Sequence, residues 1–213
     1  MFGQNYYVLF IMSYQSPQGM RLFDDTGNRL YINADERAAL LKAAAAAPRE
    51  LKCFAHVMVH TGARISEVLA LTFAHVDLSA HSIIIHSLKK RRTGIYRAVP
   101  VPVELIEMLD MVYGIRETQQ RGKPAELQAR VFPWGRSRTS EKLKMLMDEA
   151  GIADGAHKTA KGLRHGFGVN AVQKGVQLNM LQKWMGHADI KTTAIYANAT
   201  GQEERDIASR MWE

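Results

Sequence analysis

The chain has 213 residues, which leaves room for one well-packed core or for one domain with a short appendage. Hydrophobic residues make up 46% and charged residues 23%, as in globular proteins, and the net charge of +7 favours polyanionic partners such as nucleic acid over polycations. The single cysteine, Cys53, excludes an intrachain disulfide, so a reducing cytoplasm is the expected compartment. The early apolar run over 6–12 is too short to span a membrane and follows no basic residue, unlike a signal peptide.

The first residues predict a leader ahead of the main domain. Residues 1–20 show no clear period, and the turn residues of 25–28 between two short apolar arms predict a β-hairpin over 21–32. We therefore expect a leader over 1–32 and one domain over 33–213 that ends in a short helix.

The remaining periodicity predicts a mainly α fold with a small three-stranded antiparallel sheet. Asn33, followed three residues later by Glu36, is the pattern of a capping box, and Pro48 ends the helix that it begins. β-branched segments separated by turn residues predict the sheet. The other expected helices cover about 50–60, a segment from Ile65, 103–117, 138–150, 160–174, 178–185, 189–197 and 202–212, with a loop at 121–124, and the expected strands cover 73–78, 82–88 and 95–101.

Positive charge is concentrated in two segments that are far apart in the sequence. Residues 78–103 contain five Lys or Arg and no acid, and residues 154–191 contain six Lys or Arg against two Asp. If the fold brings the two segments together, they form one positive face.

Several basic side chains occupy positions suited to an anion. Arg64 stands at the start of a predicted helix, where the positive end of the helix dipole disfavours a cation. The position is favourable if the Arg64 side chain and the helix N-terminus bind the same anion. The structural alternative is an ion pair between Arg64 and Glu67. Lys89 lies in a turn between two strands, which can aim its ammonium group at a phosphate, although a solubilising turn has the same composition. Arg164 offers a planar fork that suits a phosphate, and Lys161 precedes it by one helical turn.

Two further candidates lie near the end of the chain. His187 follows a glycine at a predicted helix break, and Tyr196 lies nine residues later. Each of these residues alone is more often structural than functional.

Four phrases taken together are similar to the tyrosine recombinase (phage integrase) family: TGARISEVLAL, a hairpin ending in RAVPVP, KGLRHGFG and WMGHADIKTTAIYA. They extend over roughly 33–200. The short length and the phrase HSLKK most resemble the fimbrial phase-variation invertases, which lack a separate core-binding domain. The resemblance implies the catalytic-domain fold of DNA breaking and rejoining enzymes.

The resemblance also implies a role for each matching residue. Tyr196 would attack a DNA phosphodiester and form a 3′-phosphotyrosyl bond. Arg64 and Arg164 would clamp the non-bridging oxygens, and His187 would donate a hydrogen bond to the same phosphate. Lys89 would protonate the leaving 5′-oxygen. This chemistry needs no metal and no cofactor.

The sequence departs from the family pattern at two places. Lys161 stands where the family has histidine, so we expect retained but altered chemistry. The turn near Lys89 is about three residues longer than usual, which makes Lys90 the alternative proton donor. The other residues expected to contact DNA are Lys90, Arg91, Arg92, Arg97, Lys158, His165, Lys183 and Lys191.

No metal site is expected from the sequence. His56 and His60 have helical i, i+4 spacing, but the carboxylate of an HExxH zinc motif is missing between them.

The function expected from the resemblance is site-specific recombination of double-stranded DNA by a tetramer that assembles on DNA from protomers that are monomeric when free. Two alternatives remain: a catalytically silent DNA-binding regulator, and a topoisomerase that uses the same chemistry. A bacterial cytoplasmic protein at the nucleoid, with no membrane association, is expected. The predicted helix 202–212 packs either on its own domain or on a neighbouring subunit.

Overall fold

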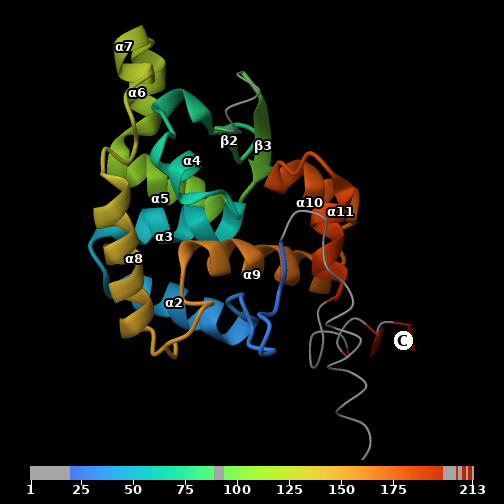
Figure 1. The fold of residues 1–213 in the computed structure, drawn as a ribbon. Helices are drawn as coiled ribbons and strands as arrows, with labels where there is room; N and C mark the ends of the chain where they lie inside the picture. Colours follow the sequence, from blue (N-terminus) through green and yellow to red (C-terminus); the bar gives the residue numbers. More distant parts are fainter. Residues whose placement is uncertain (1–19, 89–93, 199–204, 206–207, 210, 213) are drawn as a thin grey trace, which may run out of the picture.

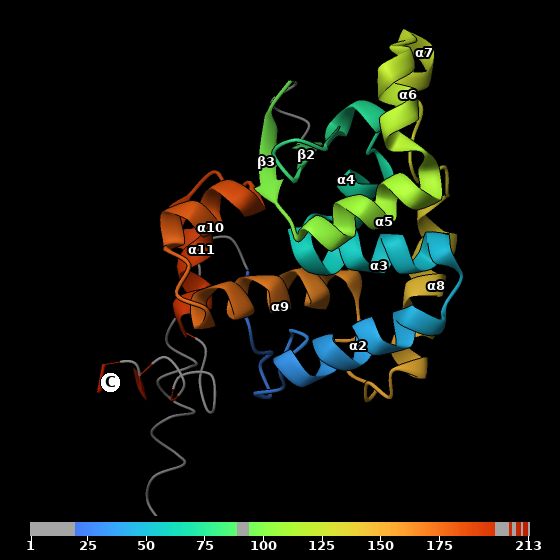
Figure 2. The same ribbon diagram turned by 180° about the vertical axis from the view of Figure 1, so that it is seen from behind.

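The computed structural model describes residues 20–88, 94–198, 205, 208–209 and 211–212. Helices dominate this part of the chain, and helices α5, α3, α9 and α2 lie one above another in Figure 1, with α8 across their ends. Figure 2 shows the same stack from behind, with α10 and α11 at the other end of α9, next to the sheet. The helices are α2 (Ala34–Ala46), α3 (Arg49–Thr61), α4 (Ile65–Leu69), α5 (Val103–Tyr113), α6 (Ile115–Arg121), α7 (Pro124–Leu127), α8 (Arg136–Glu149), α9 (Ala160–Gln173), α10 (Leu178–Met185) and α11 (Ile190–Ala194), with 3-10 turns η1 (Phe73–His75) and η2 (Ile195–Asn198).

The capping box predicted at the start of α2 is confirmed. The Asn33 side chain accepts a hydrogen bond from the backbone N–H of Glu36 at 2.8 Å, and the Glu36 carboxylate accepts one from the backbone N–H of Asn33 at 3.0 Å. Two of the free N–H groups at the helix start are thereby paired, which stabilises this end of α2.

The three-stranded antiparallel sheet is confirmed, in the order β1 (Val76–Asp77), β2 (Ser82–His86) and β3 (Tyr96–Pro100). Its first strand is shorter than predicted, because Phe73–His75 forms a 3-10 turn in which the His75 ring accepts from the backbone N–H of Thr72 at 3.2 Å. The side chains of β3 alternate between exposed and buried, as a sheet with one covered face requires.

The helix predicted over 103–117 is two helices. Gly114 adopts a left-handed conformation, with φ of 64°, and ends α5 before α6 begins at Ile115. This conformation is open to glycine at little energetic cost, which explains the break. The predicted loop at 121–124 leads into the short helix α7, and the predicted helix 202–212 lies largely outside the described residues.

The predicted hairpin over 21–32 is a single tight turn with one antiparallel bridge, between Phe23 and Arg29. The segment then runs against α9, where the backbone N–H of Ile32 donates to the Gly162 carbonyl at 3.0 Å. A Cβ on Gly166 would lie 2.2 Å from the Ile32 carbonyl oxygen, so only glycine permits this approach. The segment before α2 is thereby packed on the helix that carries Arg164.

The hydrophobic core forms two clusters. The larger one joins α2, α3, α5, α8 and the inner face of the sheet, and the smaller one gathers residues of 22–31, α9, α10 and η2 around Tyr196. Among the described residues, no helix combines the length and apolar character needed to cross a membrane.

Candidate active site

Arg164 lies in the interior, on the face of α9 that meets α3 and α10. Its Nη1 donates to the Gly62 carbonyl at 2.6 Å, and its Nη2 donates to the Met185 carbonyl at 2.7 Å. Burial, together with the nearby charge of Arg64, lowers the pKa of Arg164 to about 10, so the guanidinium remains charged at neutral pH. Backbone carbonyls from the ends of two helices thus hold a buried cation in one orientation.

His187 is positioned by the loop that follows α10. Gly186 ends this helix in a left-handed conformation, with φ of 66°, and the chain turns so that the His187 ring reaches Arg164. Nε2 of His187 lies 3.0 Å from Nη2 of Arg164, and Nδ1 lies 3.0 Å from the hydroxyl of the buried Thr193. A guanidinium only donates, so Nε2 accepts from Arg164 and Nδ1–H donates to Thr193.

Tyr196 lies in η2 and is completely buried. Its ring stacks on that of His187, with centroids 6.2 Å apart and planes 12° apart, and its hydroxyl lies 3.1 Å from Nδ1 of His165. Burial raises the pKa of Tyr196 to about 12, against the opposing charges of Arg164 and Arg64. The phenol is therefore protonated at neutral pH in this arrangement.

Arg64 completes the group through the buried carboxylate of Glu67. Nη1 of Arg64 lies 3.0 Å from one oxygen of Glu67, and the other oxygen accepts from Nη2 of Arg97 at 2.6 Å. Burial acts to raise the pKa of Glu67, but the hydrogen bond and charge of Arg97 hold it below its ordinary value. The ion pair considered as the alternative for Arg64 is therefore present. It leaves the guanidinium one-third exposed, and the charge of Arg64 acts to lower the pKa of both Arg164 and Tyr196.

The structure places three of the predicted DNA-contacting residues in the interior. Arg97 lies on the covered face of the sheet and donates through Nε to the Trp184 carbonyl at 2.7 Å. His165 is 2% exposed and faces Tyr196. Lys158 is buried in ion pairs with Asp148 and with Asp154, the latter at 3.1 Å. Each of these residues is bound to a partner inside the fold, which argues against a direct DNA contact, and their predicted contacts with DNA stay predictions.

Three of the other predicted residues lie on the surface, and four lie outside the part of the chain that the structure describes. Lys161, Lys183 and Lys191 are exposed, the first at the start of α9 and the others at the end of α10 and the start of α11. The predicted turn residues Lys89, Lys90, Arg91 and Arg92 lie outside the described residues.

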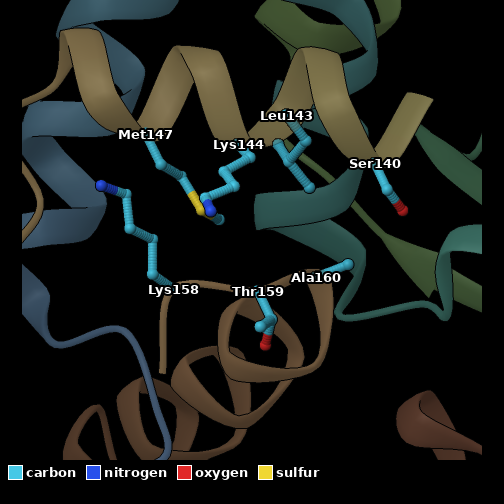
Figure 3. A pocket seen from close by; sticks show the side chains of 7 residues that line it. All are labelled: Ser140, Leu143, Lys144, Met147, Lys158, Thr159 and Ala160. Atoms are coloured by element: carbon cyan, nitrogen blue, oxygen red, sulfur yellow. The ribbon is translucent and has the colours of Figure 1, made fainter. Parts of the chain in front are cut away.

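A cavity of about 190 Å³ lies between α8 and the start of α9, apart from the group around Tyr196. Figure 3 shows its lining, in which the ammonium group of Lys158 points away from Thr159 and Ala160. The cavity shares no side chain with the candidate active site.

Within the described part of the chain, no group of three or more histidine, cysteine or acidic side chains is arranged to hold a metal ion. The rings of His56 and His60 lie 5.7 Å apart, and burial with the charge of Arg37 lowers the pKa of His60 to about 4.

Sequence reasoning identified Glu67 as a partner of Arg64 but did not identify the supporting roles of Arg97 and Thr193. The spacing of Arg64 and Glu67 signals their pairing, but no local pattern indicates that Arg97 joins them from 30 residues further along the chain. Thr193 belongs to the phrase WMGHADIKTTAIYA, but the phrase does not indicate that its hydroxyl pairs with His187.

Residues 31–203 match the pattern of the phage integrase family. The chain belongs to the phage integrase family. Among curated members, the tyrosine recombinase XerD of Mycobacterium leprae (strain TN) is 29% identical over 191 residues, which cover 83% of this chain and 58% of that protein. The chain spans about half the length of the curated relatives it matches.

Solved structures of integrase-like recombinases share the fold of this family member. The crystal structure of XerA recombinase has a TM-score of 0.69 at 24% identity, covering 86% of this chain and 65% of XerA. XerH site-specific recombinase in a post-cleavage complex with its difH substrate has a TM-score of 0.68 at 23% identity, covering 89% of this chain and 56% of XerH. The fold predicted from the sequence, that of a tyrosine recombinase catalytic domain, is confirmed.

Proposed function

We propose that this phage integrase family member cleaves and rejoins double-stranded DNA at specific sites through Tyr196. The Tyr196 oxygen attacks a phosphodiester, loses its proton and bonds to the phosphorus as a 3′-phosphotyrosine, while the 5′-oxygen leaves and takes up a proton. Attack by a 5′-hydroxyl on the phosphotyrosine reseals the strand and returns the proton to Tyr196. The covalent bond conserves the energy of the phosphodiester, so rejoining needs no ATP.

The observation that carries this proposal is the gathering of Arg164, His187, Tyr196 and Arg64 from separate elements into one group. Arg164 contacts His187, His187 stacks on Tyr196, and the charges of both arginines act on the Tyr196 hydroxyl. Two cations beside a phenol favour the phenolate and stabilise the negative charge that develops around a pentacovalent phosphorus. A protein that only binds DNA needs neither a tyrosine nor a buried arginine at this place.

The proton for the leaving oxygen would come from Lys89, with Lys90 as the alternative. Lys161, which is exposed on the first turn of α9, would donate to a phosphate oxygen in place of the histidine that the family pattern predicts.

Double-stranded DNA is the proposed partner because XerH was solved on its difH substrate and the XerD relatives are tyrosine recombinases. The exposed Lys183 and Lys191 and the net charge of +7 support an electrostatic attraction to DNA. We further propose that protomers, which are monomeric when free, assemble on DNA into a tetrameric synapse. Within the family, we assign the chain to the fimbrial-invertase type. Its proposed place of action is the nucleoid in a bacterial cytoplasm.

The test is the formation of a covalent protein–DNA adduct. The protein is incubated with nicked duplexes that carry candidate sites, and we expect an adduct that survives denaturation. Tyr196→Phe should abolish it, whereas Tyr96→Phe, at an exposed tyrosine of β3, should leave it unchanged. Tight binding with no adduct on any site would favour the silent regulator, and relaxation of supercoiled DNA without strand exchange would favour the topoisomerase.

A further inference from the structure

Among the residues that the structure describes, the side chain of His165 makes one hydrogen bond, to the proposed nucleophile. Nδ1 of His165 lies 3.1 Å from the Tyr196 hydroxyl, the two rings lie 5.8 Å apart, and both residues are almost completely buried. The other ring nitrogen, Nε2, is buried and has no hydrogen-bond partner among the residues that the structure describes.

The imidazole of His165 is a polar ring in the interior of the protein, where an apolar ring is the more stable choice. Besides His187, which stacks on its ring, Tyr196 belongs to an apolar cluster that includes Val169, Leu181 and Met185. A buried polar ring with one unpaired nitrogen destabilises a core, whereas an apolar ring packs there without that penalty. What the histidine supplies, and an apolar ring does not, is the hydrogen bond to Tyr196. Its pKa is lowered to about 4 by burial and by the charges of Lys161 and Arg164, so the ring is neutral and can pair with a neutral phenol.

Gly168 makes room for Tyr196 on the same helix. A Cβ at Gly168 would lie 2.6 Å from three atoms of the Tyr196 ring, far inside van der Waals contact. The glycine therefore lets the ring lie flat on α9, one turn from His165. With the ring 0% exposed, its hydroxyl has no access to a DNA phosphate from this position, because the surrounding core excludes DNA.

We propose that His165 is a positioning residue that holds Tyr196 in a buried resting position on α9, from which the hydroxyl has to be released before it attacks DNA. This assignment rests on the proposed function, since it takes Tyr196 as the nucleophile. His165 sets the resting place of the phenol through Nδ1, and Gly168 provides the space.

The accessibility of individual tyrosines tests this assignment without any DNA. The protein is treated with tetranitromethane, and the nitration rate of each tyrosine is measured by peptide mass spectrometry. In the unaltered chain we expect Tyr196 to react as slowly as the buried Tyr31 of the same cluster, and far more slowly than the exposed Tyr96. His165→Gln, which places no polar atom at the Nδ1 position, should raise the Tyr196 rate about tenfold while Tyr31 stays protected.

Two further variants separate positioning from simple support of the fold. His165→Asn places a polar atom near the position of Nδ1 and should keep Tyr196 protected. Gly168→Ala keeps His165 and displaces the ring by steric contact, so it should expose Tyr196. The assignment would be overturned if Tyr196 were equally protected from nitration in the Gln and Asn variants of His165. It would also be overturned if Tyr31 and Tyr196 gained nitration rate in parallel in these two variants. A chain that never forms the DNA adduct but shows the expected nitration pattern would refute the proposed function and leave the buried position of Tyr196 intact.

Discussion

The guanidinium of Arg164 and the imidazole of His187 are in direct contact, with 3.0 Å between Nη2 and Nε2. The same guanidinium is anchored on the carbonyls of Gly62 and Met185, which belong to the ends of α3 and α10. One side chain of α9 therefore ties together the helix end before Arg64 and the helix end before His187, so the proposed phosphate clamp depends on how three helices pack.

Replacing Arg164 tests this arrangement directly. Arg164→Lys keeps the charge but cannot reproduce a planar fork that donates to three acceptors, so we expect the rate of adduct formation on nicked DNA to fall at least about a hundredfold. Arg116→Lys, in an exposed pair with Asp110, is the matched control and should leave the rate unchanged. A rate for Arg164→Lys within about threefold of the unaltered protein would contradict the proposed clamp.

Removing the charge of Glu67 should destabilise the fold. Glu67→Gln leaves Arg97 buried without its carboxylate, and breaking a buried ion pair on one side lowers the free energy of unfolding by about 3–5 kcal/mol. Urea unfolding measures this loss. Glu117→Gln, whose side chain is 74% exposed in its pair with Arg121, should change the free energy by less than about 1 kcal/mol. Similar small losses in both variants would show that the Glu67 network is not a stabilising element.

His60 should make the stability of the protein depend on pH. Burial, with the charges of Arg37 and His56, lowers the pKa of His60 to about 4 from its ordinary value of 6.5, against a smaller opposing effect of Glu104. Between these two values the unfolded chain binds more protons than the folded chain, so stability falls as the pH drops from 6.5 towards 4. His60→Gln removes this titration, and the difference in free energy of unfolding between about pH 7 and pH 5 should become smaller. An unchanged difference would refute the prediction.

Salt titrations of DNA binding should separate exposed from buried lysines. Lys183→Ala and Lys191→Ala should each reduce the slope of log affinity against log salt by about one, because each exposed ammonium group is available to a phosphate. Lys158→Ala should leave the slope unchanged, since this side chain is buried against Asp148 and Asp154. An equal reduction of the slope in all three variants would argue against the assignment of Lys158 to the interior.

Local patterns in the sequence determined much of the fold. The capping box of Asn33 and Glu36 marks the start of α2, and short β-branched segments separated by turn residues mark the sheet, because both depend on residues that are neighbours along the chain. The break at Gly114 was missed, since the apolar period of the predicted helix continues through it while the glycine alone decides the backbone angle.

The motifs of the sequence, through their resemblance to a family, also predicted that Arg64, Arg164, His187 and Tyr196 belong to one site. Only the tertiary structure decided that Arg97, Lys158 and His165 are interior residues with partners inside the fold. The physical reason is that a charged or titratable side chain takes its role from its partner, and Glu67, Asp148 and Tyr196 reach these residues through folding, by contacts that no local spacing encodes.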